Sequence, residues 1–167
     1  PAFKFGDDDL AGIWVAKFEA SIVGGSPEFK PQVISTNSIP IRNAFLLSID
    51  MKNNTTKYGW SSAEVDTHLT KNIEWGAIVY FAQSPYGKES EIYSNNSSLV
   101  KTGCGGSAAT SPEVPGCQNE YNSDGVVKAS TTGNITGIYD ISGGRYEYLA
   151  AMIDNEQNTY TDDYFSD

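Results

Sequence analysis

Residues 86–133 form a long polar stretch without a clear helical or strand period, and this stretch constrains the fold most. Connections of this length are uncommon inside compact domains, so the chain must hold much ordered loop around few regular elements. We expect either short irregular strands here or a loop-rich, surface-displayed insertion. A long helical or coiled-coil protein is disfavoured, because Leu is scarce while Gly, Asn and Ser are abundant.

The charge of the chain narrows the classes of partner. Its 167 residues include 11 basic and 21 acidic ones, for a net charge of −10. Such a chain is a poor electrostatic partner for nucleic acid or an anionic membrane. No apolar run approaches the roughly 18 residues that a transmembrane helix needs. Aromatic residues make up 12% of the chain, which argues against intrinsic disorder. We therefore predict one domain with no nucleic-acid partner and no transmembrane segment.

Two cysteines, Cys104 and Cys117, lie within the loop-rich insertion in a segment of small, flexible residues. A redox or metal pair is the alternative to a disulfide, but the spacing is not C-x-x-C and His68 is the only histidine. We predict a structural disulfide between them, worth about 3 kcal/mol in the chain-entropy picture. A disulfide implies an oxidising compartment. Together with the start at Pro1, it predicts a secreted, processed chain located outside the cell or on its surface.

Three segments have the periodicity of regular elements. Alternating residues over 12–19 predict a strand with at least one buried face. Apolar residues at helical spacing predict helices over 40–51 and 71–83. The members of the two helical patterns are Ile41, Phe45, Ser48 and Met51, and then Ile73, Ala77, Tyr80 and Phe81.

Shorter signals surround these segments. Residues 24–27, Gly-Gly-Ser-Pro, predict a turn, and residues 61–64 have the form of a helix capping box. Gly76 costs a helix roughly 1 kcal/mol relative to Ala, so we expect another backbone to pack closely against it. A second short strand is expected around residues 146–148.

The segment 134–148 resembles the N-x-x-G-L-Y-D-M-x-G-N-V-W-E-W signature of the formylglycine-generating-enzyme (sulfatase-modifying factor) family. Residues 13–19 resemble the early strand of that family, and residues 70–78 resemble its T-E-A-E-W-E-Y-A-A helix. These segments occur in the family's order. The residues that carry the resemblance are Glu74, Trp75, Gly137, Tyr139, Asp140, Gly143, Gly144 and Glu147.

The resemblance implies an α+β, C-type-lectin-like fold over residues 1–167, with two helices, short twisted antiparallel strands and long ordered loops. Family enzymes carry catalytic cysteines toward the C-terminal end of the domain, whereas this chain has no cysteine after Cys117. The chain also stops soon after the signature. Either the domain is abridged at its C-terminus, or the chain is a fragment. Fold alone does not transfer function.

Acidic residues cluster near both ends of the chain. Asp7, Asp8 and Asp9 lie near the start, and the tail holds Asp154, Asn155, Glu156, Asp162 and Asp163. Such oxygens could bind calcium, although no EF-hand pattern is present, and solvated acidic turns are the competing interpretation. Calcium is the one cofactor that the sequence suggests.

The aromatic residues in the resembling segments are expected to pack in a core. Trp14 and Trp75 belong to the early strand and the second helix, and Tyr146 and Tyr148 occupy the family's core tryptophan positions.

The hypothesis favoured by the sequence is a non-enzymatic binding or adhesion module of a bacterial pilus, surface protein or phage. Its partner would be a protein or glycan ligand. A structural, pilin-like subunit of an extracellular filament, with neighbouring copies as partners, is the main alternative. A formylglycine-generating-type oxidase is the weakest hypothesis, because its thiol pair would lie in the wrong segment.

Overall fold

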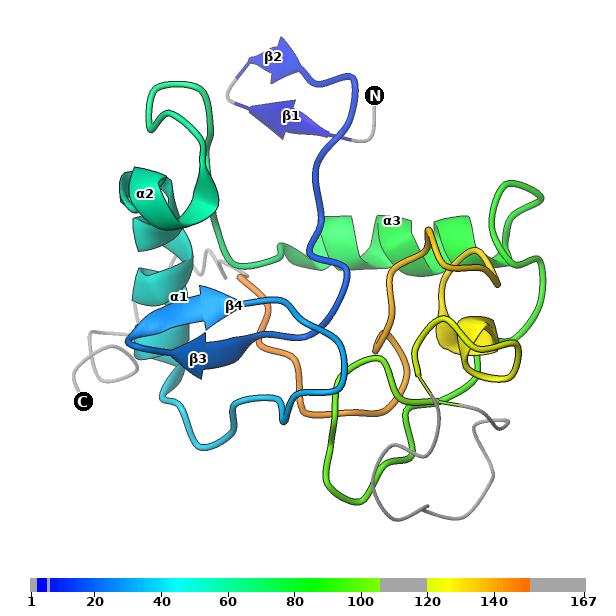
Figure 1. Cartoon of the computed structure of the whole chain (residues 1–167). Coiled ribbons are helices and arrows are strands. Elements are labelled where there is room, and N and C mark those ends of the chain that lie inside the picture. The colour runs from blue at the N-terminus through cyan, green and yellow to red at the C-terminus, as the bar shows by residue number, and fades with distance from the viewer. Residues whose placement is uncertain (1–2, 6, 106–119, 151–167) are drawn as a thin grey trace, which may run out of the picture. The chain divides into compact units, whose positions relative to one another are not determined.

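The computed structural model describes residues 3–5, 7–105 and 120–150. These residues form a mixed α and β structure with three α-helices, two 3-10 segments and two small antiparallel sheets (Figure 1). Contacts between residues divide the chain into two compact units. Unit 1 comprises Pro1–Asn37 and Ile73–Tyr146, and unit 2 comprises Ser38–Asn72 and Glu147–Asp167. The units are described separately below, and the single domain stays a prediction.

Two hairpins supply the strands of unit 1. β1 (Lys4–Phe5) pairs with β2 (Asp8–Asp9), and β3 (Ser21–Val23) pairs with β4 (Ser26–Glu28), both antiparallel. Gly24 and Gly25, with φ of 59° and 78°, form the two-residue turn between β3 and β4. Positive φ at both central residues is the geometry of a type I′ hairpin turn, which glycine adopts without strain. The predicted turn is confirmed.

The strand predicted over residues 12–19 does not form. The segment is irregular, and single hydrogen bonds to another segment replace a ladder: the Tyr139 N–H donates to the Lys17 carbonyl at 2.9 Å. Phe18 is buried, whereas the side chain of Trp14 is fully exposed, at 104%. The alternating pattern over residues 12–19 therefore reflects one buried residue, Phe18, rather than a pleated strand. The predicted core position of Trp14 is wrong.

Helix α3 (Asn72–Gln83) confirms the predicted second helix but buries a different face. The buried residues are Glu74, Ile78 and Ala82, four positions apart. Ile73 and Tyr80, from the predicted apolar stripe, are 65% and 81% exposed.

The segment that returns after α3 explains this choice of face. The Glu89 N–H donates to the Ala82 carbonyl at 3.1 Å, and a side chain at Gly87 would collide with the Phe81 carbonyl oxygen. The small side chain of Ala82 lets this backbone approach closely. A Cβ built on Gly76 meets nothing within 4 Å, so the expected close packing at Gly76 is wrong and occurs at Gly87 instead.

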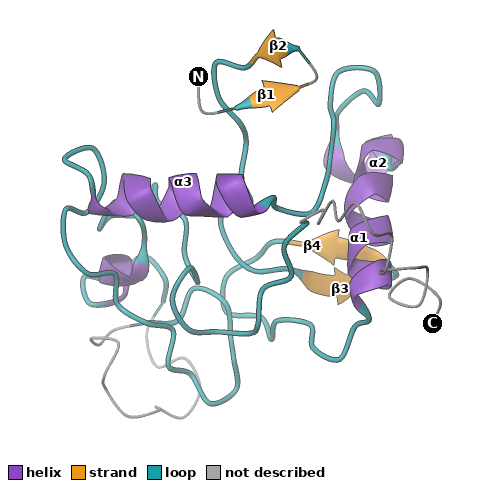
Figure 2. Cartoon of the chain, turned by 180° about the vertical axis from the view of Figure 1, so that it is seen from behind, coloured by secondary structure: helices purple, strands orange, loops and turns teal. Residues whose placement is uncertain are grey.

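The described parts of the loop-rich stretch, residues 86–105 and 120–133, are ordered by hydrogen bonds more than by regular structure (Figure 2). Their one helical element is the 3-10 segment η2 (Val126–Ala129). Thr102 is inaccessible to solvent, and its backbone bonds to Gln32 and Val33 at 2.7 and 2.8 Å. The polar loop thus supplies part of the interior of unit 1, because its backbone groups find partners there.

Aromatic rings form the core of unit 1. Phe18 and Tyr139 lie 5.3 Å apart between ring centroids, and Tyr121 meets both rings edge-on. Val126 and Ala129 of η2 complete the cluster. Edge-to-face pairs of this kind stabilise a core beyond their buried area.

Unit 2 consists of three short helical elements in succession. These are α1 (Ile41–Asp50), the 3-10 segment η1 (Met51–Asn53) and α2 (Thr55–Tyr58). Helix α1 confirms the helix predicted over 40–51. The sequence analysis did not find α2, which the Asn54 side chain caps by accepting from the Lys57 N–H at 3.2 Å.

The residues predicted to begin a helix at Ser61 form a turn instead. The Glu64 N–H donates to the Ser61 carbonyl at 3.0 Å, and no helix follows before α3. The Ser61 hydroxyl accepts from the Ala63 N–H at 3.3 Å. The serine of the capping-box pattern therefore stabilises a local turn instead of a helix N-terminus. Serine side chains can hydrogen-bond to the backbone in either structure.

None of the described residues of unit 2 is a buried apolar residue. Ile41, Phe45 and Leu46 on α1 are each about two-fifths exposed. The unit is held largely by polar contacts: Thr67 Oγ1 accepts from the Lys52 N–H at 3.0 Å and donates to the Ile49 carbonyl at 3.3 Å. Across the described part of the chain, every helix is too short or too polar to cross a membrane.

Candidate functional site

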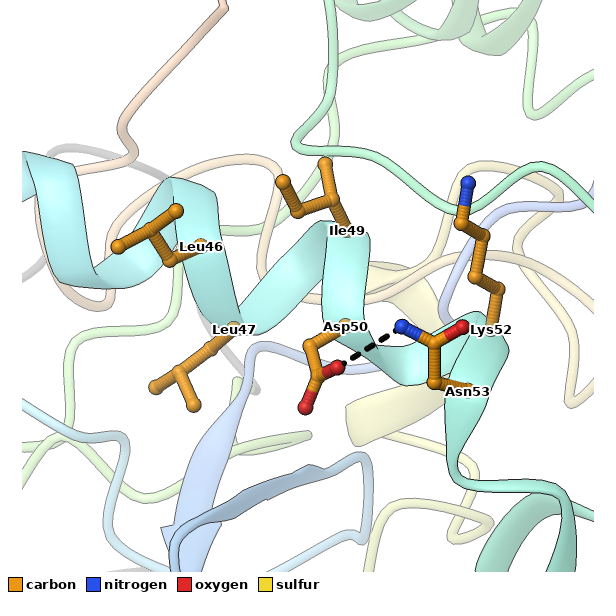
Figure 3. A pocket seen from close by; sticks show the side chains of 6 residues that line it. All are labelled: Leu46, Leu47, Ile49, Asp50, Lys52 and Asn53. Atoms are coloured by element: carbon orange, nitrogen blue, oxygen red, sulfur yellow. Dashed lines mark hydrogen bonds between the residues drawn. The ribbon is translucent and has the colours of Figure 1, made fainter.

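The described residues of each unit form a hollow that could receive a ligand. The hollow in unit 2 follows a single stretch of chain, and Figure 3 shows its side chains spread along α1 and η1. The Asn53 amide donates to the Asp50 carboxylate at 3.0 Å and closes one end. Its lining residues are Leu46, Leu47, Ile49, Asp50, Lys52 and Asn53. Among the described residues, the lining comes from one stretch of chain alone, so this hollow is the weaker candidate.

The hollow in unit 1, which we call the α3 groove, is built from three separate segments. Its volume is about 480 Å³, within the range of small-molecule sites. One wall is the helix α3, and the other walls are segments 89–92 and 141–142. The lining residues are Trp75, Val79, Gln83, Glu89, Ser90, Glu91, Ile92, Ile141 and Ser142. Convergence of distant segments is typical of binding sites, so the α3 groove is the candidate functional site.

Backbone hydrogen bonds hold the walls of the α3 groove together. The Asn95 N–H donates to the Ser142 carbonyl at 2.7 Å, and the Gly144 N–H donates to the Asn95 carbonyl at 3.0 Å. Gly143 lies between them with φ of 79°, where a side chain would collide with the Asn95 carbonyl. Glycine is therefore required for segment 141–144 to approach residue 95 this closely.

A buried carboxylate, Asp140, lies next to the groove and joins three segments. Its Oδ1 accepts from Asn95 Nδ2 and from the Gly103 N–H, both at 2.9 Å, and its Oδ2 accepts from the Glu19 N–H at 3.4 Å. Burial raises the pKa of Asp140 to about 6, even though these hydrogen bonds favour the ionised form. We call these residues (Glu19, Asn95, Gly103 and Asp140) the Asp140 cluster.

The backbone on two sides of the α3 groove has an unusual conformation. Glu89 and Asp140 have φ of 60° and 65°, in the left-handed region that non-glycine residues rarely adopt. Each costs roughly 1–2 kcal/mol and persists because the surroundings impose it. Such strain gathers at functional sites, and here it fixes the directions of segments 89–92 and 141–142.

The groove combines an apolar floor with acidic and amide groups. Val79, Ile92 and Ile141 supply apolar surface, and the exposed Glu89 and Glu91 supply two carboxylates. No Lys or Arg lines it. The arrangement suits a neutral or cationic ligand that offers hydroxyl or amide groups.

Trp75 adds a hydrogen-bond donor to the same wall. Its Nε1–H is buried and has no acceptor among the described residues. A buried donor without a partner costs roughly 1–3 kcal/mol. Trp75 is therefore only partly the core residue that the sequence predicted, since its ring also lines the groove.

The structure places most of the residues that carry the family resemblance in the frame of unit 1. Tyr139 and Asp140 are fully buried, and Gly137 has no room for a side chain, which would lie 2.7 Å from the Thr132 nitrogen. Gly144 approaches the Glu19 carboxylate, and Glu74 is buried on α3. Glu147 belongs to unit 2 and is exposed.

The aromatic residues at the end of the signature, Tyr146 and Tyr148, do not pack in the core as predicted. Tyr146 is 100% exposed and Tyr148 is 41% exposed, and no strand forms around them. The predicted short strand at residues 146–148 is therefore wrong, because no described segment pairs with it. Trp14, Tyr80, Phe81 and Tyr86 are exposed as well, so the described part of unit 1 presents five large aromatic side chains to solvent.

The proposed calcium ligands in the tail, Asp154 to Asp163, lie outside the described residues. In the described part of the chain, no three His, Cys, Asp or Glu side chains are placed to hold a metal ion. Asp7, Asp8 and Asp9 are exposed at the β1–β2 hairpin. His68 contacts Asp66 at 3.2 Å and belongs to no helix.

Cys104 is buried, 3% exposed, and is disulfide-bonded. Its predicted partner Cys117 lies outside the described residues, so the pairing stays a prediction. A redox-active thiol must be accessible, whereas Cys104 is buried.

Sequence analysis missed most residues of the α3 groove. Gln83, Glu89 and Glu91 lie around the helix stop at Pro85, where the sequence signals only the end of a helix. Segment 141–142 was marked by its place in the signature but not by any property of a ligand site. Only the tertiary contacts bring the two regions together.

No family model, no curated protein and no solved structure matches the chain.

Proposed function

We propose that this chain is a binding or adhesion module with a C-type-lectin-like fold, displayed outside the cell on a bacterial pilus, surface protein or phage. The α3 groove carries the proposal. It is a concave site of about 480 Å³ built from three segments on a hydrogen-bonded frame. The resemblance to the formylglycine-generating-enzyme family, outlined above, supports the fold.

The chemistry of the groove favours a glycan or a peptide segment as ligand. Carboxylates such as Glu91 and amides such as Gln83 accept and donate hydrogen bonds to hydroxyl and amide groups. Exposed aromatic rings such as those of Trp14 and Tyr146 supply flat contact area at low entropic cost. An acidic lining disfavours anionic ligands.

A non-catalytic role fits the cysteines better than oxidase chemistry does. Cys104 is buried in a disulfide, whereas oxidase chemistry of the formylglycine-generating type needs accessible thiols. A filament subunit is the second candidate, because Ile73 and Tyr80 on the outer face of α3 are exposed and could meet a neighbouring copy.

A binding screen tests the proposal. We would measure wild-type binding to a panel of neutral and cationic oligosaccharides and peptides, and then repeat the hits with Gln83→Ala and Glu91→Ala. Glu64→Ala, an exposed glutamate of unit 2, is the matched control. We expect the groove variants to weaken binding about tenfold or more and the control to leave it unchanged.

Two results would overturn the assignment. Equal affinity of the groove variants and wild type would remove the α3 groove as the site. The absence of any ligand, together with self-association that Ile73→Glu abolishes, would favour the filament subunit.

A further inference from the structure

Beside the α3 groove, two lysines of unit 1 share one aromatic ring. The Lys88 ammonium lies 4.5 Å from the centroid of the Tyr93 ring, and the Lys128 ammonium lies 5.7 Å from the same centroid. The chain has a net charge of −10, with only 11 basic residues, so two neighbouring cations are unusual in it. We call Lys88, Tyr93 and Lys128 the lysine pair site.

The lysine pair site is built into the fold. The Lys88 N–H donates to the Thr131 carbonyl at 2.9 Å, and the Tyr93 N–H donates to the Lys128 carbonyl at 3.0 Å. The aliphatic stem of Lys88 lies against Gly133, with Cγ 3.3 Å from the position of a built Cβ. These contacts fix both lysine backbones and hold the stem of Lys88 in place before any ligand arrives.

Neither ammonium group has a carboxylate partner in the described part of the chain. Ion pairs of other residues there include those of Lys30 with Glu28 and of His68 with Asp66. The Lys88 ammonium donates to the Glu91 backbone carbonyl, which carries only a partial charge. The site therefore holds two positive charges and one ring, and the Glu91 carboxylate acts on Lys88 without forming an ion pair with it.

The charge of Lys128 repels the ammonium group of Lys88 and affects its pKa. Desolvation by burial lowers its pKa most, and the charge of Lys128 lowers it further, while the Glu91 carboxylate raises it. A bound anion would reverse the second of these effects, because it attracts both cations.

We propose that the lysine pair site binds an oxyanion, the phosphate or sulfate group of a small ligand. Lysine ammonium groups recognise such groups as point charges. The charge of Lys128 acts on Lys88, so an anion bound beside the Tyr93 ring would be attracted by both lysines. The hydroxyl of Tyr93 offers a further donor. This proposal does not depend on the function proposed for the α3 groove, whose acidic lining rejects the same ligands.

Calorimetric titration of the whole chain with inorganic phosphate, and separately with inorganic sulfate, tests the site. Sodium chloride at matched ionic strength is the reference for general screening. We expect saturable binding of at least one oxyanion, and the stronger of the two identifies the group. Loss of one charge-assisted contact in Lys128→Gln should weaken binding about tenfold, and Lys128→Arg should retain it. Lys128 is exposed, so neither variant should disturb folding.

Lys57→Gln is the matched control. The Lys57 ammonium lies 5.7 Å from the Tyr58 ring centroid in unit 2, and no second lysine is found over that ring. We expect its variant to bind as wild type does. As a second measurement, phosphate should raise the pKa of Lys88, followed by NMR at its side-chain carbon. Failure of wild type to bind either oxyanion beyond the chloride reference, or equal losses in Lys128→Gln and Lys57→Gln, would overturn the proposal.

Discussion

The two units differ in what holds them together. Unit 1 has an aromatic core around Phe18 and Tyr139 and a buried carboxylate that joins three segments. Unit 2 has a regular helix, α1, yet its described residues include no buried apolar side chain. Regular secondary structure is therefore not the main source of stability in this chain. Unit 1 is mostly loop, and its loops are fixed because their polar groups are paired in the interior.

The comparison also explains where the candidate site lies. A binding site needs walls that keep their positions, and the Asp140 cluster beside the α3 groove supplies them in unit 1. In the described part of the chain, the hollow of unit 2 is lined by the single stretch that forms α1 and η1. The predictions below test this difference, starting with the largest effect.

Removing one ring from the core of unit 1 should have the largest effect. Phe18→Ala should lower the free energy of unfolding by about 3–5 kcal/mol, because it deletes a buried ring and leaves a cavity. Leu46→Ala on the partly exposed α1 should cost only about 1 kcal/mol. Urea unfolding measures both. Equal losses in the free energy of unfolding would mean that α1 is as well buried as the core of unit 1. The two units would then not differ in what holds them together.

The buried Asp140 should make stability depend on pH. Its pKa is raised from 3.8 to about 6 in the folded state, so the folded protein holds this proton more tightly than the unfolded chain. The stabilisation is complete below about pH 4 and is lost as pH rises through about 6, with a total of roughly 3 kcal/mol. Unfolding free energies measured from pH 4 to pH 7 should show this fall.

Asp140→Asn is the control for the pH effect, since asparagine does not titrate. The variant should be less stable at low pH, because its Nδ2 cannot accept from the Glu19 N–H as Oδ2 does, but its pH slope in this window should be smaller. An unchanged slope would assign the pH dependence to other groups.

Close approach at Gly143 should make a small substitution costly. Gly143→Ala adds a methyl group against the Asn95 carbonyl at φ of 79°, and we expect a loss of about 2 kcal/mol or more. Gly24→Ala has a similar φ but open space, so it should lose only about 1 kcal/mol from backbone strain. Thermal melting of both variants separates collision from strain. If the two losses are the same, the fit around Gly143 is looser than its contacts indicate.

Helix α3 should become more stable when Gly76 is replaced, although the sequence predicted close packing at this glycine. A Cβ at Gly76 meets no neighbour, and alanine is the better helix former, so Gly76→Ala should stabilise the protein by up to about 1 kcal/mol. A loss of stability would show that another backbone does pack there, as the sequence suggested.

The smallest effect on stability is expected at Trp14. Its side chain is fully exposed, so Trp14→Ala should change the free energy of unfolding by about 0.5 kcal/mol or less. Binding is the sharper readout for this residue, because an exposed tryptophan contributes mainly to contacts with a ligand. A large loss of stability would instead mean that Trp14 is covered in solution.

The sequence by itself determined the helices and the turn that depend mainly on residues close together in the chain. The helices over 40–51 and 71–83 followed from apolar spacing, and the β3–β4 turn followed from Gly24 and Gly25. The mixed fold class followed from the same signals. A long stretch of ordered loop was expected at 86–133, and its described parts have little regular structure.

Only the tertiary structure decided which surfaces these elements bury. It turned α3 so that Ala82 faces inward, because a returning backbone fits against a small side chain. It left Trp14 and Tyr146 in solvent, although their neighbours Phe18 and Tyr139 form the core. It also brought residues 89–92 beside residues 141–142 to form the α3 groove. Periodicity reports that a face is apolar, but the choice among apolar faces depends on shape and on hydrogen-bond partners far away in the chain.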